Sequence, residues 1–189
     1  MTLIWSSREA EVALMFAGQM GCEAVNFILK RVIKEERPPQ IYGKGYGMPS
    51  SHAQFVAYWS VFLSLFLLVR HRPPRVVRHD HQPYSFLERA LASVGALVIA
   101  AAVAWSRVYL NYHTAKQVMV GSLAGAVTAT AWYGATEVLR QTGILSWVLQ
   151  LPIARYLRIR DLVVEEDPSQ AGWEKWEERR LAALKKKGN

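Results

Sequence analysis

Cysteine is nearly absent from this chain: Cys22 is the only one among 189 residues. A single cysteine excludes an intrachain disulfide and a cysteine-based metal cluster. The N-terminus also lacks the succession of basic, apolar and small residues that marks a cleavable signal peptide, so we expect none. Apolar side chains, which make up 51% of the residues, must therefore provide most of what holds the fold together.

Positive charge is in excess but is unevenly placed. The chain carries 23 lysines and arginines against 15 aspartates and glutamates, a formal net charge of +8. These basic residues stand in short segments between long apolar runs instead of forming one soluble face, so the pattern argues against a nucleic-acid-binding protein. The length suits a single domain.

Apolar runs dominate the rest of the chain. Four of them are long enough to cross the hydrocarbon core as helices: residues 10–33, 53–70, 87–110 and 115–139. A fifth run, residues 144–156, is shorter and is interrupted by Pro152, which favours an interfacial or half-inserted helix. The sequence therefore predicts an all-α, multi-pass transmembrane helical bundle with four spanning helices and one partial or interfacial helix.

The C-terminal part has a different composition. We assign residues 1–161 to a membrane-embedded domain and residues 162–189 to a charged tail. Within the tail, residues 165–170 resemble an acidic linker, and residues 173–187 an amphipathic helix with tryptophans and basic residues. Such a helix suits the surface of a membrane, and a solvated charged tail is an equally good interpretation.

The stretch from Tyr46 to His52 organises the rest of the chain. Its proline and two serines before an apolar run are typical of a helix start, and either Ser50 or Ser51 can cap that helix with its hydroxyl. The free N–H groups of a first turn bind anions, and His52 would lie beside an anion bound there. Taken alone, the stretch favours a capped helix that happens to carry a histidine; its flanks change that interpretation.

Two further blocks of polar residues flank this helix start. Upstream, Lys30 is followed after six residues by Arg37; downstream, Arg107 is followed after five by His113. Together with the helix start they give three cations and two imidazoles, a set suited to handling an oxyanion.

Polar side chains continue this pattern into the first apolar run. They recur at steps of four, three and four residues, which puts them on one helix face: Gln19, Glu23, Asn26 and Lys30. Polar groups at membrane depth usually face protein or a water-filled cavity, so we expect this face to lead into the site.

The fourth apolar run contains Gly121 and Gly125. Two glycines at this spacing lie on one helix face and let a neighbouring helix approach closely. We interpret them as packing residues and not as part of the site.

The three blocks resemble the signature motifs of the phosphatidic-acid phosphatase type 2 superfamily. In this chain the three blocks have the sequences Lys-Glu-Glu-Arg-Pro, Tyr-Gly-Met-Pro-Ser-Ser-His and Ser-Arg-Val-Tyr-Leu-Asn-Tyr-His-Thr. These sequences resemble more narrowly those of the dolichyldiphosphatases of the endoplasmic reticulum. The resemblance covers residues 23–161. Ser51 stands where the superfamily has glycine and Gln117 where it has aspartate, and both changes resemble the dolichyldiphosphatase version.

The resemblance implies an enzyme that hydrolyses dolichyl diphosphate, or a related polyprenyl diphosphate, to the monophosphate and inorganic phosphate. It implies no metal or other cofactor, and a role in recycling the lipid carrier of protein N-glycosylation. It makes His113 the nucleophile that forms a phosphohistidine and His52 the acid that protonates the leaving oxygen. It makes five other polar residues the phosphate-binding groups: Lys30, Arg37, Ser50, Ser51 and Arg107.

Gln117 lies one helical turn after His113. The superfamily's aspartate at this position orients the nucleophile and stabilises its positive charge. A glutamine oxygen can still accept the imidazole N–H and fix the tautomer, but it brings no full charge. Simple helix packing is the alternative role for Gln117.

Three other functions account for part of the pattern. One is a phosphatase for another lipid phosphate, such as phosphatidate or a sphingoid-base phosphate. Another is a catalytically inactive membrane protein that binds lipid phosphates. The third is a membrane haem protein with His52 and His113 as ligands, which would leave the three cations without a purpose.

The predicted helices also give the chain a sidedness. The helix ends that carry the three blocks all lie on one face of the membrane, whereas the basic loop of residues 70–78 and the tail lie on the other. Short loops rich in lysine and arginine stay cytoplasmic, so we expect a cytosolic tail and a lumenal site. Lys186 and Lys187 resemble a dilysine signal for retrieval to the endoplasmic reticulum, and binding of anionic lipid by a basic tail is the alternative.

Overall fold

A computed structural model describes residues 6–38, 45–71, 84–162, 164 and 168–187 of the chain. Within these residues the secondary structure is helical, and the one β-type contact is an isolated bridge between Glu9 and Arg160. The helices are α2 (Ala10–Ile33), α3 (Ser51–Leu65), the π-helical turn η1 (Phe66–Arg70), α4 (Phe86–Tyr109), α5 (Ala115–Gln141), α6 (Ile144–Gln150), α7 (Pro152–Tyr156) and α8 (Pro168–Lys187). The predicted all-α class is confirmed.

Four helical spans in the described part of the chain are long and apolar enough to cross a membrane. They are Ala10–Ile33, Ser51–Arg70, Phe86–Tyr109 and Ala115–Gln141, which agree with the four predicted spans to within two residues at each end. The fifth apolar run is interrupted as expected. Leu151 has an extended backbone between α6 and α7, because the proline that follows disfavours a helical conformation in the residue before it.

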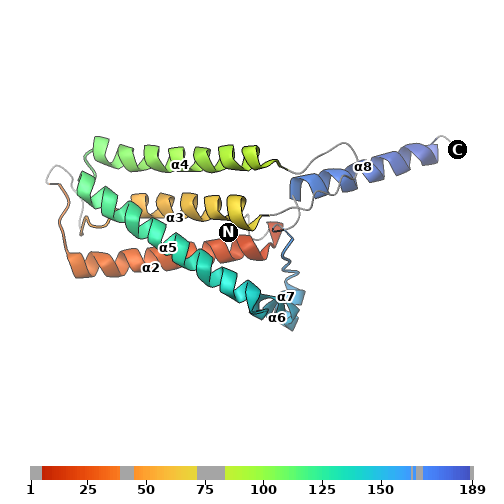
Figure 1. The fold of residues 1–189 in the computed structure, drawn as a ribbon, viewed down its shortest axis with the longest axis horizontal. Coiled ribbons are helices and arrows are strands. Elements are labelled where there is room, and N and C mark those ends of the chain that lie inside the picture. The colour runs from red at the N-terminus through yellow and green to blue at the C-terminus, as the bar shows by residue number, and fades with distance from the viewer. Residues whose placement is uncertain (1–5, 39–44, 72–83, 163, 165–167, 188–189) are drawn as a thin grey trace.

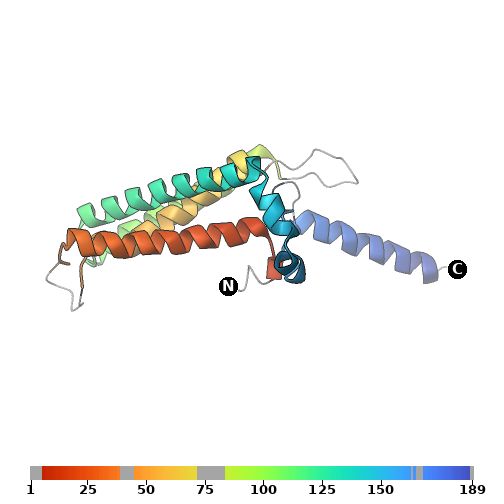
Figure 2. The ribbon, with the colours of Figure 1, turned by 90° about the horizontal axis from the view of Figure 1, so that it is seen from below.

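The long helices run side by side, with α3 in contact with α2, α4 and α5 (Figures 1 and 2). Their buried centre is a cluster of Cys22, Tyr58, Phe62 and Ala129. Helices α3 and α5 approach closely at Gly125, where an added Cβ would lie 2.2 Å from the carbonyl oxygen of Gln54. The glycine spacing therefore marks a real close crossing, as the sequence predicted.

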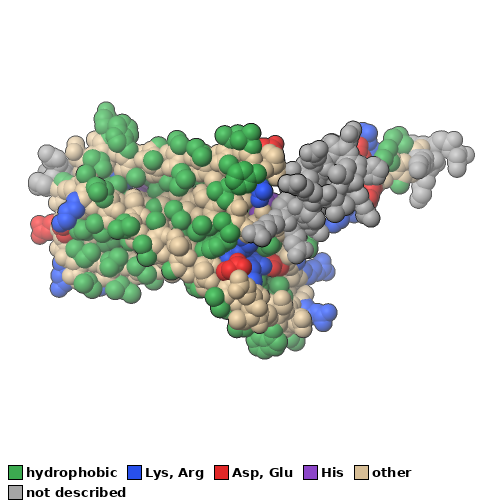
Figure 3. Space-filling model, viewed as in Figure 1, with side chains coloured by type: hydrophobic (Ala, Val, Ile, Leu, Met, Phe, Trp, Pro, Cys, Tyr) green, Lys and Arg blue, Asp and Glu red, His purple; other side chains and the backbone are tan. Residues whose placement is uncertain are grey.

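Apolar side chains cover the outside of the bundle along its length, and charged side chains gather towards its two ends (Figure 3). On α4, for example, Leu91 is 62% exposed and Val98 is 61% exposed. Such a surface is costly in water and favourable in lipid. The pattern is that of a multi-pass membrane protein.

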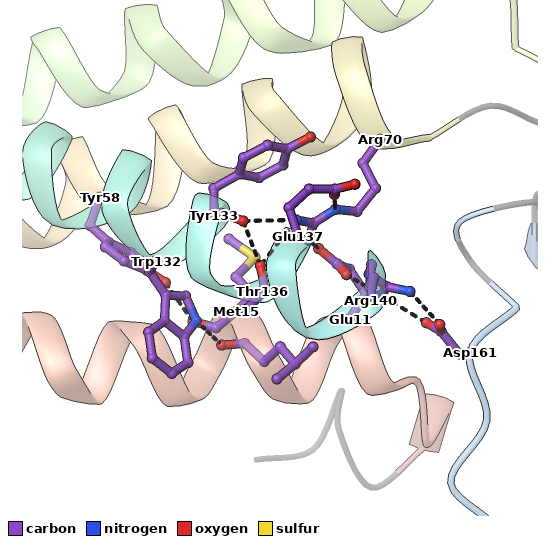
Figure 4. A network of polar contacts seen from close by, with 11 residues as sticks. Glu11, Met15, Tyr58, Arg70, Trp132, Tyr133, Thr136, Glu137, Arg140 and Asp161 are labelled. Atoms are coloured by element: carbon purple, nitrogen blue, oxygen red, sulfur yellow. Dashed lines mark hydrogen bonds and ion pairs between the residues drawn. The ribbon is translucent and has the colours of Figure 1, made fainter. Parts of the chain in front are cut away.

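A network of paired charges closes one end of the bundle (Figure 4). Arg70 donates to Glu11 at 2.6 Å and to Glu137 at 3.1 Å, and Arg140 pairs with Glu11 and with Asp161. The side chains of Arg70 and Glu11 are only 3% and 4% exposed. Charges buried this deeply persist only when they are paired, so the network ties α2, α5 and the segment after α7 together.

Helix α8 extends away from the bundle at the end where this network lies (Figure 1). It begins at Pro168, earlier than expected, so the predicted linker of residues 165–170 is too long. Proline fits the first turn of a helix because the missing N–H has no partner there in any case. The aromatic pair Trp173 and Trp176 lies on this helix, with ring centroids 4.8 Å apart.

Candidate active site

The three blocks meet at the opposite end of the bundle from the charge network. This end holds the last turns of α2 and α4 and the first turns of α3 and α5 (Figure 1). Lys30 lies in the last turn of α2, His52 in the first turn of α3, and Arg107 in the last turn of α4. His113 lies in the short connection between α4 and α5.

Lys30 is bound to the start of α3 by a chain of hydrogen bonds. Its ammonium donates to Ser51 Oγ at 2.8 Å, and that hydroxyl donates to Asn26 Oδ1 at 3.0 Å. The Asn26 amide then donates to Gln54 Oε1 at 2.7 Å, and Gln54 donates to the carbonyl of Cys22 at 2.8 Å. The polar face predicted on α2 therefore points into the protein and fixes where the Lys30 charge lies.

Ser50 holds the N-cap position of α3, but the capping bond predicted for its hydroxyl is wrong. Ser51 does not cap either, because its hydroxyl is used by Lys30 and Asn26. The Ser50 main-chain N–H donates to the Gln117 carbonyl at 3.1 Å, and Ser50 Oγ is buried without a protein partner among the described residues. The first turn of α3 therefore keeps both a free hydroxyl and its free N–H groups, the donors that an anion needs.

Arg37 reaches the same place from the loop after α2. Its Cγ would lie 3.0 Å from a Cβ added at Gly47, so the loop and the start of α3 are packed together. Arg37 Nε is buried and, like the Ser50 hydroxyl, has no partner in the part of the chain that the structure describes. A buried guanidinium donor without a partner is costly, and a phosphate oxygen is the acceptor that it suits best.

His52 lies within electrostatic range of all three cations of the blocks: Arg107, Lys30 and Arg37. It is on the solvent-exposed side of the first turn of α3. An imidazole in this position can exchange protons with solvent and with a bound phosphate ester.

Arg107 and His113 are joined through the main chain. The His113 N–H donates to the Arg107 carbonyl at 3.1 Å, and the Tyr112 N–H donates to the same oxygen at 3.0 Å. The Arg107 guanidinium lies over the Tyr112 ring, 5.3 Å from its centroid. This compact turn fixes the distance between the third cation and the second imidazole.

His113 is 6% exposed, and its Nδ1 lies 3.1 Å from Gln117 Oε1. Thr114 begins α5 with a capping box in which the Thr114 hydroxyl accepts from the Gln117 N–H and Gln117 Oε1 accepts from the Thr114 N–H. Burial is the largest effect and lowers the pKa of His113, and nearby Arg37 and Lys30 lower it as well, whereas the hydrogen bonds to Gln117 and to the Gly47 main chain oppose this shift. The imidazole is therefore held in the neutral form that a nucleophile needs.

Two residues of the site were not predicted from the sequence. Gln117 Nε2 donates to Glu35 Oε1 at 3.1 Å and to the carbonyl of Glu36 at 2.8 Å. Glu35 also accepts a hydrogen bond of 2.8 Å from Lys116. The loop that carries both glutamates has no periodicity that could have indicated these contacts.

The arrangement as a whole can bind and cleave a phosphate ester. Three cations and a set of free donors can neutralise phosphoryl oxygens, one neutral imidazole can attack phosphorus, and a second can transfer a proton. No group of three histidine, cysteine, aspartate or glutamate side chains that could hold a metal ion occurs within residues 6–38, 45–71, 84–162, 164 and 168–187.

Known proteins match most of the chain. Residues 11–140 match the sequence model of the PAP2 superfamily. The chain is 52% identical to a protein named "Putative dolichyldiphosphatase" from Neurospora crassa, with 96% of this chain and 81% of that protein covered. It is 39% identical to dolichyldiphosphatase 1 of Homo sapiens, with 85% and 67% covered, and 31% identical to the dolichyldiphosphatase of Saccharomyces cerevisiae, with 82% and 64% covered. No solved structure matches the chain.

All three blocks lie inside the region that the superfamily model matches. The resemblance inferred from the residues of the three blocks is therefore confirmed, and the matching relatives include proteins named dolichyldiphosphatase. The chain belongs to the PAP2 superfamily, and within it to the group of the dolichyldiphosphatases.

Proposed function

We propose that this protein hydrolyses dolichyl diphosphate, or a related polyprenyl diphosphate, to the monophosphate and inorganic phosphate. The observation that carries the proposal is a pair of buried donors, Ser50 Oγ and Arg37 Nε, which have no partner among the described residues and lie at the same end of the bundle as two imidazoles. The names of the relatives supply the substrate class.

The terminal phosphoryl group binds between the cations. Lys30, held by Ser51, and the forks of Arg37 and Arg107 neutralise its oxygens, because a planar guanidinium can donate to two of them at once. The Ser50 hydroxyl and the free N–H groups of the first turn of α3 complete the cradle. These donors are most effective on the additional charge of the transition state.

The reaction proceeds in two displacements. His113 Nε2 attacks the terminal phosphorus while the bond from phosphorus to the bridging oxygen breaks, and His52 gives its proton to that oxygen. Water deprotonated by His52 then attacks the phosphohistidine, which releases inorganic phosphate and restores both imidazoles. Gln117 accepts the His113 Nδ1 proton in a hydrogen bond and so keeps the lone pair on Nε2.

The proposed chemistry needs no metal ion, because the three cations provide the charge that Mg²⁺ supplies in other phosphoryl-transfer sites. Phosphate release from dolichyl diphosphate should therefore continue in excess chelator and be abolished in His113→Ala. Loss of activity in chelator, restored by Mg²⁺, would contradict metal independence.

The substrate assignment has its own test. Faster phosphate release from phosphatidate or a sphingoid-base phosphate than from dolichyl diphosphate would contradict it.

The substrate and the fold together support a location in the endoplasmic-reticulum membrane, where the product would return to the carrier pool of protein N-glycosylation. The site lies at one end of the bundle, and the end of α3 that leads into η1 and the start of α8 lie towards the other (Figure 1). Most of the basic loop of residues 70–78 lies outside the described residues. Its arginines and those of the tail support a cytosolic opposite end, hence a lumenal site with residues 162–189 as a cytosolic tail.

The sidedness and the retrieval signal can be tested separately. A tag after Asn189 should be digested by protease added to sealed microsomes, and a protected tag would reverse the orientation. Substitution of Lys186 and Lys187 by serine should release the protein to later compartments. An unchanged location would remove the dilysine signal alone and leave the orientation in place.

A further inference from the structure

The Gln117 side chain uses its complete hydrogen-bonding capacity. Its Oε1 receives the His113 imidazole at 3.1 Å and the Thr114 N–H at 3.3 Å. Its Nε2 has two hydrogens, and these go to Glu35 Oε1 at 3.1 Å and to the Glu36 carbonyl at 2.8 Å. Gln117 is fully buried, so water cannot substitute for any of these partners.

The partners on the far side of the amide determine which way it points. Turned by 180°, the amide would direct Oε1 at the Glu35 carboxylate and the Glu36 carbonyl, both of which only accept hydrogen bonds. Its Nε2 would then face the Thr114 N–H, which only donates. The contacts with the two glutamates therefore direct Oε1 towards His113. Because an amide oxygen can only accept a hydrogen bond, His113 Nδ1 must carry the hydrogen.

Glu35 is itself held in place and kept charged. Lys116 donates to its Oε2 at 2.8 Å, and its main-chain carbonyl accepts the Gly47 N–H at 2.7 Å. The hydrogen bonds from Lys116 and Gln117 lower the pKa of Glu35, so the carboxylate remains an acceptor well into the acid range. The loop after α2 is thereby attached to both α5 and the start of α3.

We propose that Glu35 is a positioning residue for the reaction: it fixes the Gln117 amide and, through it, the His113 tautomer with the lone pair on Nε2. The inference rests on the proposed function, in which His113 is the nucleophile. The Glu35 carboxylate also supplies the negative charge that Gln117 lacks, although it is one hydrogen bond further from the imidazole than Gln117 is. We expect this charge to stabilise the imidazolium that forms transiently at His113.

Substitution of Glu35 should act on turnover and not on substrate binding. In Glu35→Ala the amide keeps only the Glu36 carbonyl as an acceptor and loses the carboxylate charge, and kcat should fall about tenfold or more, the cost of a hydrogen bond to a charged group, with KM within about twofold. Glu35→Gln, which can still present an oxygen to Gln117 Nε2, should recover most of the loss. Glu36→Ala is the matched control, since within the described residues Glu36 joins the network only through its main-chain carbonyl.

Two further measurements separate positioning from a loss of folded protein. Glu35→Ala should cost little when added to Gln117→Leu, because the route through the amide is already broken. The acid limb of kcat/KM should also move to lower pH in Glu35→Ala, since the imidazolium loses support, whereas a smaller folded fraction leaves the limb unchanged. Equal kcat in Glu35→Ala and Glu36→Ala, or additive losses with Gln117→Leu, would overturn the inference.

A readout that needs no substrate distinguishes this inference from the proposed function. In ¹⁵N-histidine spectra of the purified protein, His113 Nδ1 should carry hydrogen and Nε2 should not, and Glu35→Ala should raise the share of the tautomer with hydrogen on Nε2. Assignment is feasible because the chain has five histidines. If the wild type is inactive but Glu35→Ala shows this spectral change, the proposed reaction is contradicted while the positioning role of Glu35 is supported. An unchanged His113 tautomer in Glu35→Ala would overturn the positioning role.

Discussion

Lys30 and Ser51 lie on different helices and are joined by a hydrogen bond of 2.8 Å from the Lys30 ammonium to the Ser51 hydroxyl. The same hydroxyl donates to Asn26, so it serves as acceptor and donor at once. Ser51 thus has a defined task at a position where the superfamily pattern has glycine. A long, flexible lysine side chain is in this way held in one place before substrate arrives.

We expect Ser51→Ala to lower kcat/KM for dolichyl diphosphate by about tenfold, the effect of one hydrogen bond to a charged group. The loss should be largely in KM, because Lys30 binds phosphate in the ground state as well. Ser64→Ala is the matched control on the same helix, since the Ser64 hydroxyl donates only to the Ser60 carbonyl in the described contacts. Equal effects of the two substitutions would show that the contact with Lys30 is unimportant.

His52→Ala should slow the first displacement according to the leaving group. Without a proton donor the bridging oxygen must leave as an anion, so dolichyl diphosphate should lose about 100-fold in kcat. A 2,4-dinitrophenyl phosphate, whose leaving phenolate is much less basic than dolichyl phosphate and so needs no proton, should lose much less. The rate of phosphoenzyme formation measured by rapid quench provides the comparison, and a loss that is the same for both substrates would argue against His52 as the acid.

The lowered pKa of His113 predicts activity at acid pH. Because the neutral imidazole is the nucleophile and its pKa lies below the ordinary value of about 6.5, the acid limb of kcat/KM should fall below that pH. In Gln117→Leu the bond that raises the pKa is lost, so the limb should shift further down and the plateau should drop. Over the same pH range the unfolded chain binds the proton more readily, so acidification should also reduce the free energy of unfolding. An acid limb above pH 6.5 would exclude this assignment of the limb to His113.

Gly121 fixes the start of α3 against α5. An added Cβ would lie 2.6 Å from the Ser50 carbonyl oxygen, so Gly121→Ala must separate the helices, with an expected cost of about 1–3 kcal/mol in stability. Activity should fall with it, since Ser50 and His52 move with that turn. Gly134→Ala on the same helix meets nothing within 4 Å, so it should leave activity unchanged and should not lower the melting temperature, because alanine favours a helix more than glycine does. Equal melting temperatures for the two variants would refute the close contact.

The charge network at the other end should contribute to stability and not to catalysis. Glu11 pairs with both Arg70 and Arg140, so Glu11→Ala leaves buried positive charge unpaired and should cost about 3–5 kcal/mol. Glu137→Ala removes a carboxylate that is 37% exposed and should cost less than about 1 kcal/mol. Thermal unfolding in detergent measures the difference, and a changed KM in Glu11→Ala would indicate coupling to the site.

The sequence was most informative where one physical signal dominates. Long apolar runs placed the four spans because length and hydropathy alone decide which segments cross a membrane. The spacing of the blocks correctly brought Lys30, Ser51, His52 and His113 to one end of the bundle, and the step from His113 to Gln117 predicted their hydrogen bond. Each of these depends on local periodicity or on helix direction.

Contacts made by the tertiary fold could not be predicted in this way. Glu35 and Gln117 are 82 residues apart, and Glu35 lies in a loop without a repeating pattern. The hydroxyl of Ser50 was wrongly expected to cap α3, because a serine before an apolar run is the ordinary sign of a cap. The packing of Gly121 against Ser50 and the hydrogen bond from the Ser50 N–H to the Gln117 carbonyl show that this turn is positioned by its neighbour instead.

The two ends of the bundle differ in how their positive charges are balanced. Arg70 and Arg140 are matched by carboxylates, whereas Lys30, Arg37 and Arg107 have no ion-pair partner among the described residues. Lipid on the flanks of such a site confines its field and directs it towards the aqueous face. A diphosphate headgroup moving along the bilayer surface is therefore steered towards the first turn of α3, and dissolved salt weakens that attraction before it weakens the chemistry.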